Sequence, residues 1–175
     1  MQKALFLDRD GILNVDKGYV YKWDDIVWVE EVFTMIKLGM ERDYKIIVLT
    51  NQSGIHYNKY TKDDVESLHM QMNKYLLDKK LAVDDWIYCA EVDSESRKPR
   101  PGMLLEAKNK FDIDLESSFM IGDKFTDIFE TDGKFTGPVT FLVKGQYDLS
   151  KAQVGSRVKI FNNHLDIVEE LKKVL

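Results

Sequence analysis

The stretch Ala4-Leu5-Phe6-Leu7-Asp8-Arg9-Asp10-Gly11 joins an apolar run to an acidic turn. Consecutive apolar residues suit a strand buried on both faces, as strands of a parallel sheet are. Two more apolar runs end in polar clusters: Ile46 to Leu49 leads into Thr50 to Gln52, and Phe119 to Ile121 leads into Gly122 to Lys124. Because the carboxyl ends of parallel strands share one edge of a sheet, the sequence predicts that these clusters meet in one crevice.

Helical patterns alternate with these runs along the chain. Two further apolar stretches, Trp86 to Cys89 and Val139 to Val143, also indicate strands. Helical spacing and capping residues predict helices over about 32–42, 62–79, 102–111, 127–132 and 164–175. The alternation predicts an α/β protein with a doubly wound, mainly parallel sheet and helices on both faces.

The composition is that of an ordinary globular domain, with 175 residues, of which 44% are hydrophobic and 31% charged. One domain over residues 1–175 is therefore expected. A formal net charge of −5 without a basic stripe argues against a nucleic-acid partner. The single cysteine, Cys89, excludes an internal disulfide and a cysteine-rich zinc site.

The apolar stretch near the amino terminus stops at Asp8, which makes it too short for the core of a signal peptide. No later segment reaches the roughly 18 apolar residues that a membrane helix needs. We expect a cytoplasmic protein that does not associate with membranes, and a monomer.

Asp8 is placed to act as a nucleophile, because it ends the strand expected near the middle of the sheet. A carboxylate that attacks phosphorus forms an aspartyl phosphate and divides a difficult hydrolysis into two steps. Asp10 is placed to protonate the departing oxygen and then to take a proton from water. The pair alone equally allows a structural interpretation, in which both aspartates cap a turn and Gly11 supplies a positive φ angle.

A metal ion is indicated by Asp123, which follows another predicted strand. Together with Asp8 it offers the hard oxygen ligands that Mg²⁺ prefers. Asp127 lies four residues later and is placed to orient a ligand; alternatively, it is a first-turn acid favoured by the helix dipole.

Two residues are candidates for binding a phosphoryl group. Thr50 can donate its hydroxyl to a phosphoryl oxygen, although threonine is also common at strand ends. Lys98 supplies a compact positive charge within the rigid basic turn Arg97 to Pro101.

The order Asp-x-Asp, Thr, Lys, Gly-Asp-x₄-Asp resembles the haloacid dehalogenase superfamily of aspartate-nucleophile phosphatases. Longer stretches look like its D-glycero-D-manno-heptose 1,7-bisphosphate phosphatase and histidinol-phosphate phosphatase branch; they are Asp8 to Asn14, Asp16 to Val20, Thr50 to Ile55, Arg97 to Met103 and Met120 to Lys124. The resemblance covers nearly the whole chain. It implies a Rossmann-like domain without a large cap, which agrees with a short flap at about 11–25.

The resemblance also implies the roles of individual residues. The catalytic residues would be Asp8, Asp10, Thr50 and Lys98. Mg²⁺ would be held by Asp8, the backbone carbonyl of Asp10, and Asp123. Asp127 would orient these ligands without binding the ion. The residues implied for substrate recognition are Asn14, Asp16, Gly18, Tyr19, Asn51, Gln52, Ser53, Arg97 and Lys124. The substrate implied is a small phosphorylated metabolite, such as heptose 1,7-bisphosphate losing its C7 phosphate, or alternatively histidinol phosphate.

The chain departs from this branch in one loop. Bacterial members carry a zinc site built from Cys-x-His and Cys-x-Cys. Here Cys89-Ala90-Glu91 and Ser94-Glu95-Ser96 stand in those places, so structural zinc is not expected. The loop, about 90–101, is also short, which leaves the choice of substrate open.

Two other classes of function remain as alternatives. A receiver-like phospho-switch also gathers aspartates, a threonine and a lysine, but takes its phosphoacceptor from a middle strand of the chain. A catalytically silent sugar-phosphate-binding protein would explain the missing zinc ligands. His56 could touch substrate, but we expect it to face solvent or to cap a turn. We assign no chemistry to His69 or His164, and packing is expected for the three tryptophans, Trp23, Trp28 and Trp86.

Overall fold

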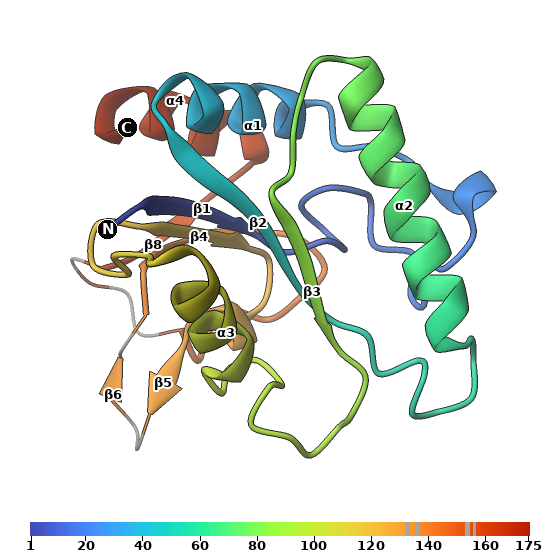
Figure 1. Ribbon diagram of the computed structural model, residues 1–175. Helices are drawn as coiled ribbons and strands as arrows, with labels where there is room; N and C mark the ends of the chain where they lie inside the picture. Colours follow the sequence, from blue (N-terminus) through green and yellow to red (C-terminus); the bar gives the residue numbers. More distant parts are fainter. Residues whose placement is uncertain (132–133, 136, 153–154, 156) are drawn as a thin grey trace.

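The computed structural model describes residues 1–131, 134–135, 137–152, 155 and 157–175. Its centre is a six-stranded sheet of order β3-β2-β1-β4-β7-β8, in which all neighbours run parallel (Figure 1). β1 (Lys3–Leu7) lies between β2 (Tyr44–Asn51) and β4 (Phe119–Gly122). The strand order reverses at β1, and such a reversal opens a crevice at the carboxyl ends of the strands.

The remaining strands extend the sheet toward its edges. β3 (Asp85–Cys89) forms one edge, while β7 (Val139–Val143) and β8 (Val158–Phe161) extend the other. A separate antiparallel pair consists of β5 (Glu130–Thr131) and β6 (Lys134–Phe135).

Helices cover both faces of the sheet (Figure 1). Apolar side chains of α1 (Glu31–Glu41), α2 (Lys62–Asp78) and α4 (His164–Val174) share one core cluster, and those of α3 (Gly102–Phe111) belong to the cluster on the opposite face. Within the described part of the chain, no helix combines the length and apolar character needed to cross a membrane.

The apolar run of β1 is explained by this two-sided cover. Leu5 and Leu7 point into the cluster with α1, α2 and α4, whereas Ala4 and Phe6 point into the cluster with α3. All four side chains have no exposed area. Full burial of a large apolar side chain contributes about 1.5–3 kcal/mol, so a polar residue at these positions would be costly. The predicted doubly wound α/β fold is confirmed.

Helix starts follow the capping residues. The Thr61 hydroxyl accepts a hydrogen bond from the Asp64 N–H at 3.1 Å, and the Asp64 carboxylate accepts one from the Thr61 N–H at 2.8 Å. This reciprocal box satisfies donors that a helix leaves free at its amino end. Asn163 caps α4 through the Asp166 N–H at 2.9 Å.

One sequence prediction about secondary structure was wrong, and one strand of the main sheet was missed. A helix over about 127–132 is absent, because Phe125–Asp127 forms a single 3₁₀ turn, η2, and β5 begins at Glu130; residue 132 lies outside the described residues. The Asp127 side chain folds back onto the backbone of the preceding loop and closes this turn. The strand β8 was not predicted, since its side chains are only partly buried apart from Val158.

Residues 11–25 form a loop beside the carboxyl end of β1. Its base is closed by backbone hydrogen bonds from Val15 N–H to the Val27 carbonyl and from Val29 N–H to the Leu13 carbonyl, at 2.8 and 2.9 Å. A 3₁₀ turn, η1 (Trp23–Asp25), ends it.

Candidate active site

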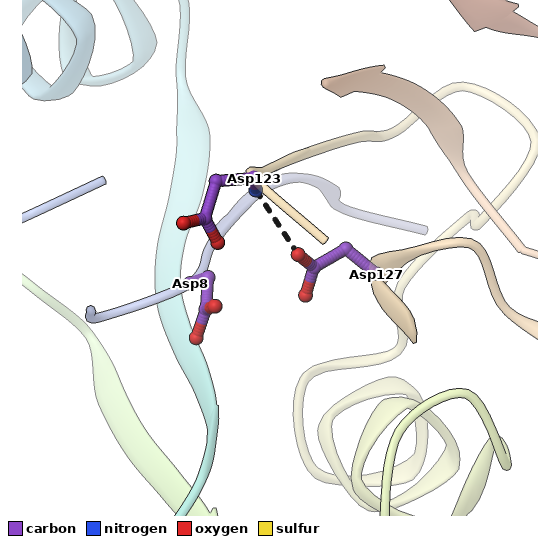
Figure 2. A group of neighbouring side chains, drawn as sticks. All are labelled: Asp8, Asp123 and Asp127. Atoms are coloured by element: carbon purple, nitrogen blue, oxygen red, sulfur yellow. Dashed lines mark hydrogen bonds between the residues drawn. The ribbon is translucent and has the colours of Figure 1, made fainter. Parts of the chain in front are cut away.

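Three aspartates converge at the carboxyl edge of the sheet. Asp8 follows β1, Asp123 follows β4, and Asp127 ends the 3₁₀ turn η2 (Figure 2). One carboxylate oxygen from each lies within 4.8 Å of the others. All three are buried, with 0–4% of each residue exposed. Carboxylates this close repel one another unless positive charge compensates them.

Lys98 supplies part of that charge. Its Nζ lies 2.6 Å from Asp127 Oδ1 and 3.0 Å from Asp8 Oδ1, and it donates to the Leu49 carbonyl at 2.8 Å. Burial alone would lower the pKa of Lys98, but the charges of Asp127 and Asp8 outweigh it and raise the pKa. The ammonium is therefore charged and fixes Oδ1 of Asp8, which also accepts the Arg9 N–H at 2.8 Å. No described residue donates a hydrogen bond to Oδ2 of Asp8.

Asn51 holds the loop that carries Lys98. Its Oδ1 accepts the Lys98 N–H at 3.0 Å, and its Nδ2 donates to the Lys98 carbonyl at 3.1 Å. The end of β2 thus fixes the backbone of a residue 47 positions later in the chain. In the same loop, Ser94 Oγ accepts the Ser96 N–H at 3.1 Å, so a serine turn occupies the place of the zinc-ligand pair.

Asp127 organises the loop after β4. Its Oδ2 accepts the N–H of Asp123 at 3.2 Å (Figure 2). The same oxygen accepts the N–H of Lys124 at 3.1 Å. A Cβ at Gly122 would lie 2.1 Å from this oxygen, so the contact requires glycine there. Because both Asp127 oxygens already have protein partners, Asp127 supports the site rather than offering a free ligand atom.

Asp123 is short of partners. Among the described residues, none donates a hydrogen bond to its buried Oδ1, and the nearest cation, Lys124 Nζ, lies 3.9 Å away. Burial and the charge of Asp8 raise the pKa of Asp123 to about 8, and burial raises that of Asp8 to about 6. A divalent cation would reverse this effect by stabilising both carboxylates. The donor set of hard oxygens fits Mg²⁺.

Gly11 brings the Asp10 turn against Asp123. It has a φ of +95°, and a Cβ here would lie 2.1 Å from Asp123 Oδ2. Both the backbone angle and the space exclude other residues. The glycine therefore allows the loops after β1 and β4 to touch.

A cavity of about 640 Å³ opens beside Asp10. Of the residues predicted to recognise substrate, those in its lining are Asp16, Gly18, Tyr19, Asn51, Gln52, Ser53, Arg97 and Lys124. Asn14 is outside the lining and fully buried; its Nδ2 donates to Asp10 Oδ1 at 3.0 Å. Thr50 is also buried, and its Oγ1 accepts from Gln52 Nε2 at 2.8 Å.

One wall of this cavity was not predicted from the sequence. Tyr147, Asp148 and Lys151, from the loop after β7, line it together with Phe125 and Thr126. This loop has no motif, and its approach to residues 130 positions earlier depends on the order of strands in the sheet.

The loop after β7 contacts the 11–25 loop directly. The Tyr147 hydroxyl donates to Asp16 Oδ2, which also lies 3.2 Å from Lys124 Nζ. Lys124 lies over the Tyr147 ring, 4.5 Å from its centre. Although burial opposes it, hydrogen bonds from Tyr147 and the Gly18 N–H lower the pKa of Asp16, which keeps this carboxylate ionised.

Residues 6–140 match the protein family described as polynucleotide kinase 3 phosphatase. The D-glycero-alpha-D-manno-heptose-1,7-bisphosphate 7-phosphatase of Campylobacter jejuni is 40% identical over 127 residues, which cover 72% of this chain and 74% of that protein. The D-glycero-beta-D-manno-heptose-1,7-bisphosphate 7-phosphatase of Escherichia coli K12 is 32% identical over 180 residues. The match covers 97% of this chain and 94% of that protein. The chain belongs to the heptose bisphosphate phosphatase branch of the haloacid dehalogenase superfamily.

The same fold is found in a solved member of the branch. The crystal structure of D,D-heptose 1,7-bisphosphate phosphatase from B. bronchiseptica, complexed with magnesium and phosphate, superposes with a TM-score of 0.84. It is 24% identical, and the match covers 99% of this chain and 100% of that one. The sequence relatives confirm the predicted superfamily and branch, and the superposition confirms the predicted fold without a large cap in the described residues.

Proposed function

We propose that this protein is a Mg²⁺-dependent phosphatase that removes a phosphate group from a phosphorylated sugar. The observation that carries the proposal is the convergence of Asp8, Asp123 and Lys98 at the carboxyl ends of β1 and β4. A buried carboxylate with one fixed and one unengaged oxygen is suited to attack on phosphorus, because its line of approach is set in advance.

The reaction divides into two displacements. In the first, Oδ2 of Asp8 forms a bond to phosphorus while the ester P–O bond breaks, and Asp10 gives a proton to the departing alkoxide. In the second, water attacks the aspartyl phosphate, Asp10 takes the proton of the water, and the bond between phosphorus and Asp8 breaks. Inorganic phosphate leaves and the Asp8 carboxylate is restored. Lys98 holds Asp8 in place through both steps.

Mg²⁺ would be held by Asp8, Asp123 and the backbone carbonyl of Asp10. When bound, the ion neutralises phosphate charge and so allows an anionic nucleophile to approach an anionic ester. The buried and unpaired Oδ1 of Asp123 supports this assignment.

The substrate we propose is D-glycero-D-manno-heptose 1,7-bisphosphate, from which the C7 phosphate is removed. The relatives named for this activity include one for the α anomer and one for the β anomer. The cavity is large enough for a sugar phosphate, and the cations Arg97, Lys124 and Lys151 line it. A second phosphate on the sugar would find counter-charges there.

Release of inorganic phosphate tests the proposal. The wild-type protein with Mg²⁺ should hydrolyse heptose 1,7-bisphosphate, and chelation of the metal should stop the reaction. Asp8→Asn should lower kcat by at least ~10³-fold, since the nucleophile is lost. Asp78→Asn is a matched control, because Asp78 is an exposed residue paired with Lys74 on α2 and should leave the rate unchanged. Failure of the wild-type protein to hydrolyse any phosphomonoester, including an aryl phosphate, would refute the phosphatase assignment.

The choice of substrate needs a separate comparison. Values of kcat/KM for the α and β anomers of heptose 1,7-bisphosphate should both exceed that for histidinol phosphate. A higher value for histidinol phosphate would replace the sugar assignment while leaving the phosphatase chemistry intact.

A further inference from the structure

The side chain of Gln52 uses its whole hydrogen-bonding capacity on protein groups. Its Nε2 donates to Asp10 Oδ2 at 3.0 Å and to Thr50 Oγ1 at 2.8 Å. Its Oε1 accepts from Arg9 NH2 at 3.1 Å and from the Tyr60 hydroxyl at 2.7 Å. Two donors and two lone pairs are all that an amide offers. With 1% of its area exposed, Gln52 has no free group for a substrate.

The chemistry of its partners fixes the orientation of this amide. A guanidinium can only donate and a carboxylate can only accept, so the oxygen must face Arg9 and the nitrogen must face Asp10. Rotation of the amide by 180° would place donor against donor and acceptor against acceptor.

Arg9 is the second member of the group and has no exposed area. Its NH2 lies 2.9 Å from Asp10 Oδ2 and 3.2 Å from Oδ1, and donates to the Val20 carbonyl at 2.6 Å. Its NH1 lies 3.2 Å from Nε2 of His69. Because arginine donates, this histidine nitrogen must accept, which requires a neutral ring.

His69 and Tyr60 support the group through packed rings, and Tyr60 also lines the cavity. The His69 ring packs 4.9 Å from the ring of Trp86. The Tyr60 ring stacks on Tyr21 with ring centres 5.3 Å apart. The polar group therefore rests on side chains that are themselves packed, and this restricts its movement.

We propose that Gln52, Arg9 and Tyr60 are positioning residues that orient the Asp10 carboxylate for proton transfer. This inference rests on the proposed function, in which Asp10 is the general acid and base. Gln52 then acts through Asp10 and does not touch the substrate, although it borders the cavity. Its removal should impair those steps in which a proton moves, and spare binding.

The dependence on leaving group separates this role from a merely structural one. An alkoxide must be protonated as it departs, whereas 4-nitrophenolate is stable enough to leave without a proton. Values of kcat/KM cover the steps up to departure of the leaving group. A residue that positions the acid should therefore matter for a sugar phosphate and matter little for 4-nitrophenyl phosphate.

The test compares both esters in two variants. Gln52→Met should lower kcat/KM for heptose 1,7-bisphosphate by ~10²-fold and that for 4-nitrophenyl phosphate by less than ~5-fold, with the loss in kcat rather than KM. Tyr60→Phe removes only the hydroxyl that donates to Gln52 Oε1 and should show the same selectivity at about 3- to 10-fold. This milder variant keeps the test valid if Gln52→Met does not fold.

Two matched controls lose comparable groups elsewhere. Gln71→Met removes an exposed amide that donates to Ser67, and Tyr88→Phe removes a hydroxyl that donates to Glu66. Both should retain wild-type rates on either ester. An equal loss on both esters in the Gln52 and Tyr60 variants, a rise in KM alone, or wild-type rates would overturn the inference. A wild-type protein inactive on both esters would instead refute the proposed function, and the inference with it.

Discussion

The two aspartates of the first turn lie two residues apart but in opposite electrostatic settings. Asp8 shares a buried group with Asp123 and Asp127, in which Lys98 is the cation at the centre. Asp10 instead accepts hydrogen bonds from a buried arginine and from the neutral amides of Asn14 and Gln52. The first group has three carboxylates around one buried ammonium and is short of positive charge, whereas the charge of Asp10 is already balanced by Arg9.

This contrast indicates which of the two groups needs a bound cation: the one around Asp8 (the Asp8 side) or the one around Asp10 (the Asp10 side). The Asp8 side holds unpaired negative charge, seen in the raised pKa of Asp123 and in its buried Oδ1 without a partner. A bound cation completes it. The charge of Asp10 is already balanced by Arg9, although Arg9 Nε and Asn14 Oδ1 are buried without a hydrogen bond to any described residue. We therefore expect the Asp8 group to bind a cation and the Asp10 carboxylate to keep its position.

The largest effect that separates the two sides is expected for Lys98→Met. It would leave Asp8 and Asp127 buried without their cation, which costs about 3–5 kcal/mol of stability. Unfolding in urea and phosphate release measure the two consequences. The double variant with Asp127→Asn should regain stability but not activity, because one buried charge is removed while Asp8 remains unfixed. Recovery of activity would show that Lys98 serves only to neutralise Asp127.

Mg²⁺ should stabilise the protein more strongly at about pH 8 than at about pH 5. The raised pKa values of Asp8, about 6, and Asp123, about 8, mean that the folded protein binds more protons than the unfolded chain. Stability without metal therefore falls as pH rises from about 4 to about 8. Mg²⁺ competes with those protons, and at 100 times its Kd it adds about 2.7 kcal/mol.

Thermal unfolding with and without Mg²⁺ at the two pH values measures this effect. Asp123→Asn should nearly abolish the Mg²⁺-dependent shift in Tm. A shift of equal size at both pH values would contradict the account of the Asp8 side.

On the Asp10 side, His69 should make the protein sensitive to acid. Burial, with a smaller contribution from Arg9, lowers the pKa of His69 to about 3, against 6.5 when exposed. The unfolded chain binds more protons between these values, so stability is lost as pH falls below about 6.5. His69→Gln keeps an acceptor and removes this titration, which should flatten the pH dependence by on the order of 2 kcal/mol.

Urea denaturation across this pH range is the measurement for His69. His56→Gln changes an exposed histidine and serves as the control. If both variants follow the wild-type curve, His69 does not titrate as proposed.

The smallest effect concerns the far wall of the cavity. Tyr147→Phe removes the hydrogen bond to Asp16 but keeps the ring beneath Lys124. We expect KM for heptose 1,7-bisphosphate to rise by about 2- to 5-fold with kcat unchanged, which corresponds to less than ~1 kcal/mol. Steady-state kinetics would show this, and a fall in kcat instead would place Tyr147 closer to the chemistry than the structure indicates.

Local sequence was sufficient for the strand β1 and for most helices. The run Ala4 to Leu7 predicted a strand buried on both faces, and helical spacing with capping residues predicted a helix from about 62, because both signals depend on neighbouring residues. The predicted helix at 127–132 failed for the opposite reason. The carboxylate of Asp127 is bonded to Lys98, a residue distant in sequence, and to the backbone of its own loop.

Arg9 could have been recognised as part of the site, since a basic residue between two aspartates at a buried turn must find acidic partners. Tyr147 and Lys151 carried no such signal. Their place in the cavity depends on β7 lying beside β4, which the chain settles only by folding.

By itself the sequence determined the chemistry of this protein: which strands are buried, which carboxylates end them, and therefore which family of phosphatases it belongs to. Only the tertiary structure decided how those groups share their charges. It pairs Lys98 with Asp8 and Asp127, and it buries Asp123 Oδ1 without a hydrogen bond from any described residue. It also places Arg9 and Gln52 as hydrogen-bond donors to Asp10. The physical reason is that residue types are local, whereas burial, hydrogen-bond saturation and the pKa of a carboxylate depend on neighbours that the sheet brings from distant parts of the chain.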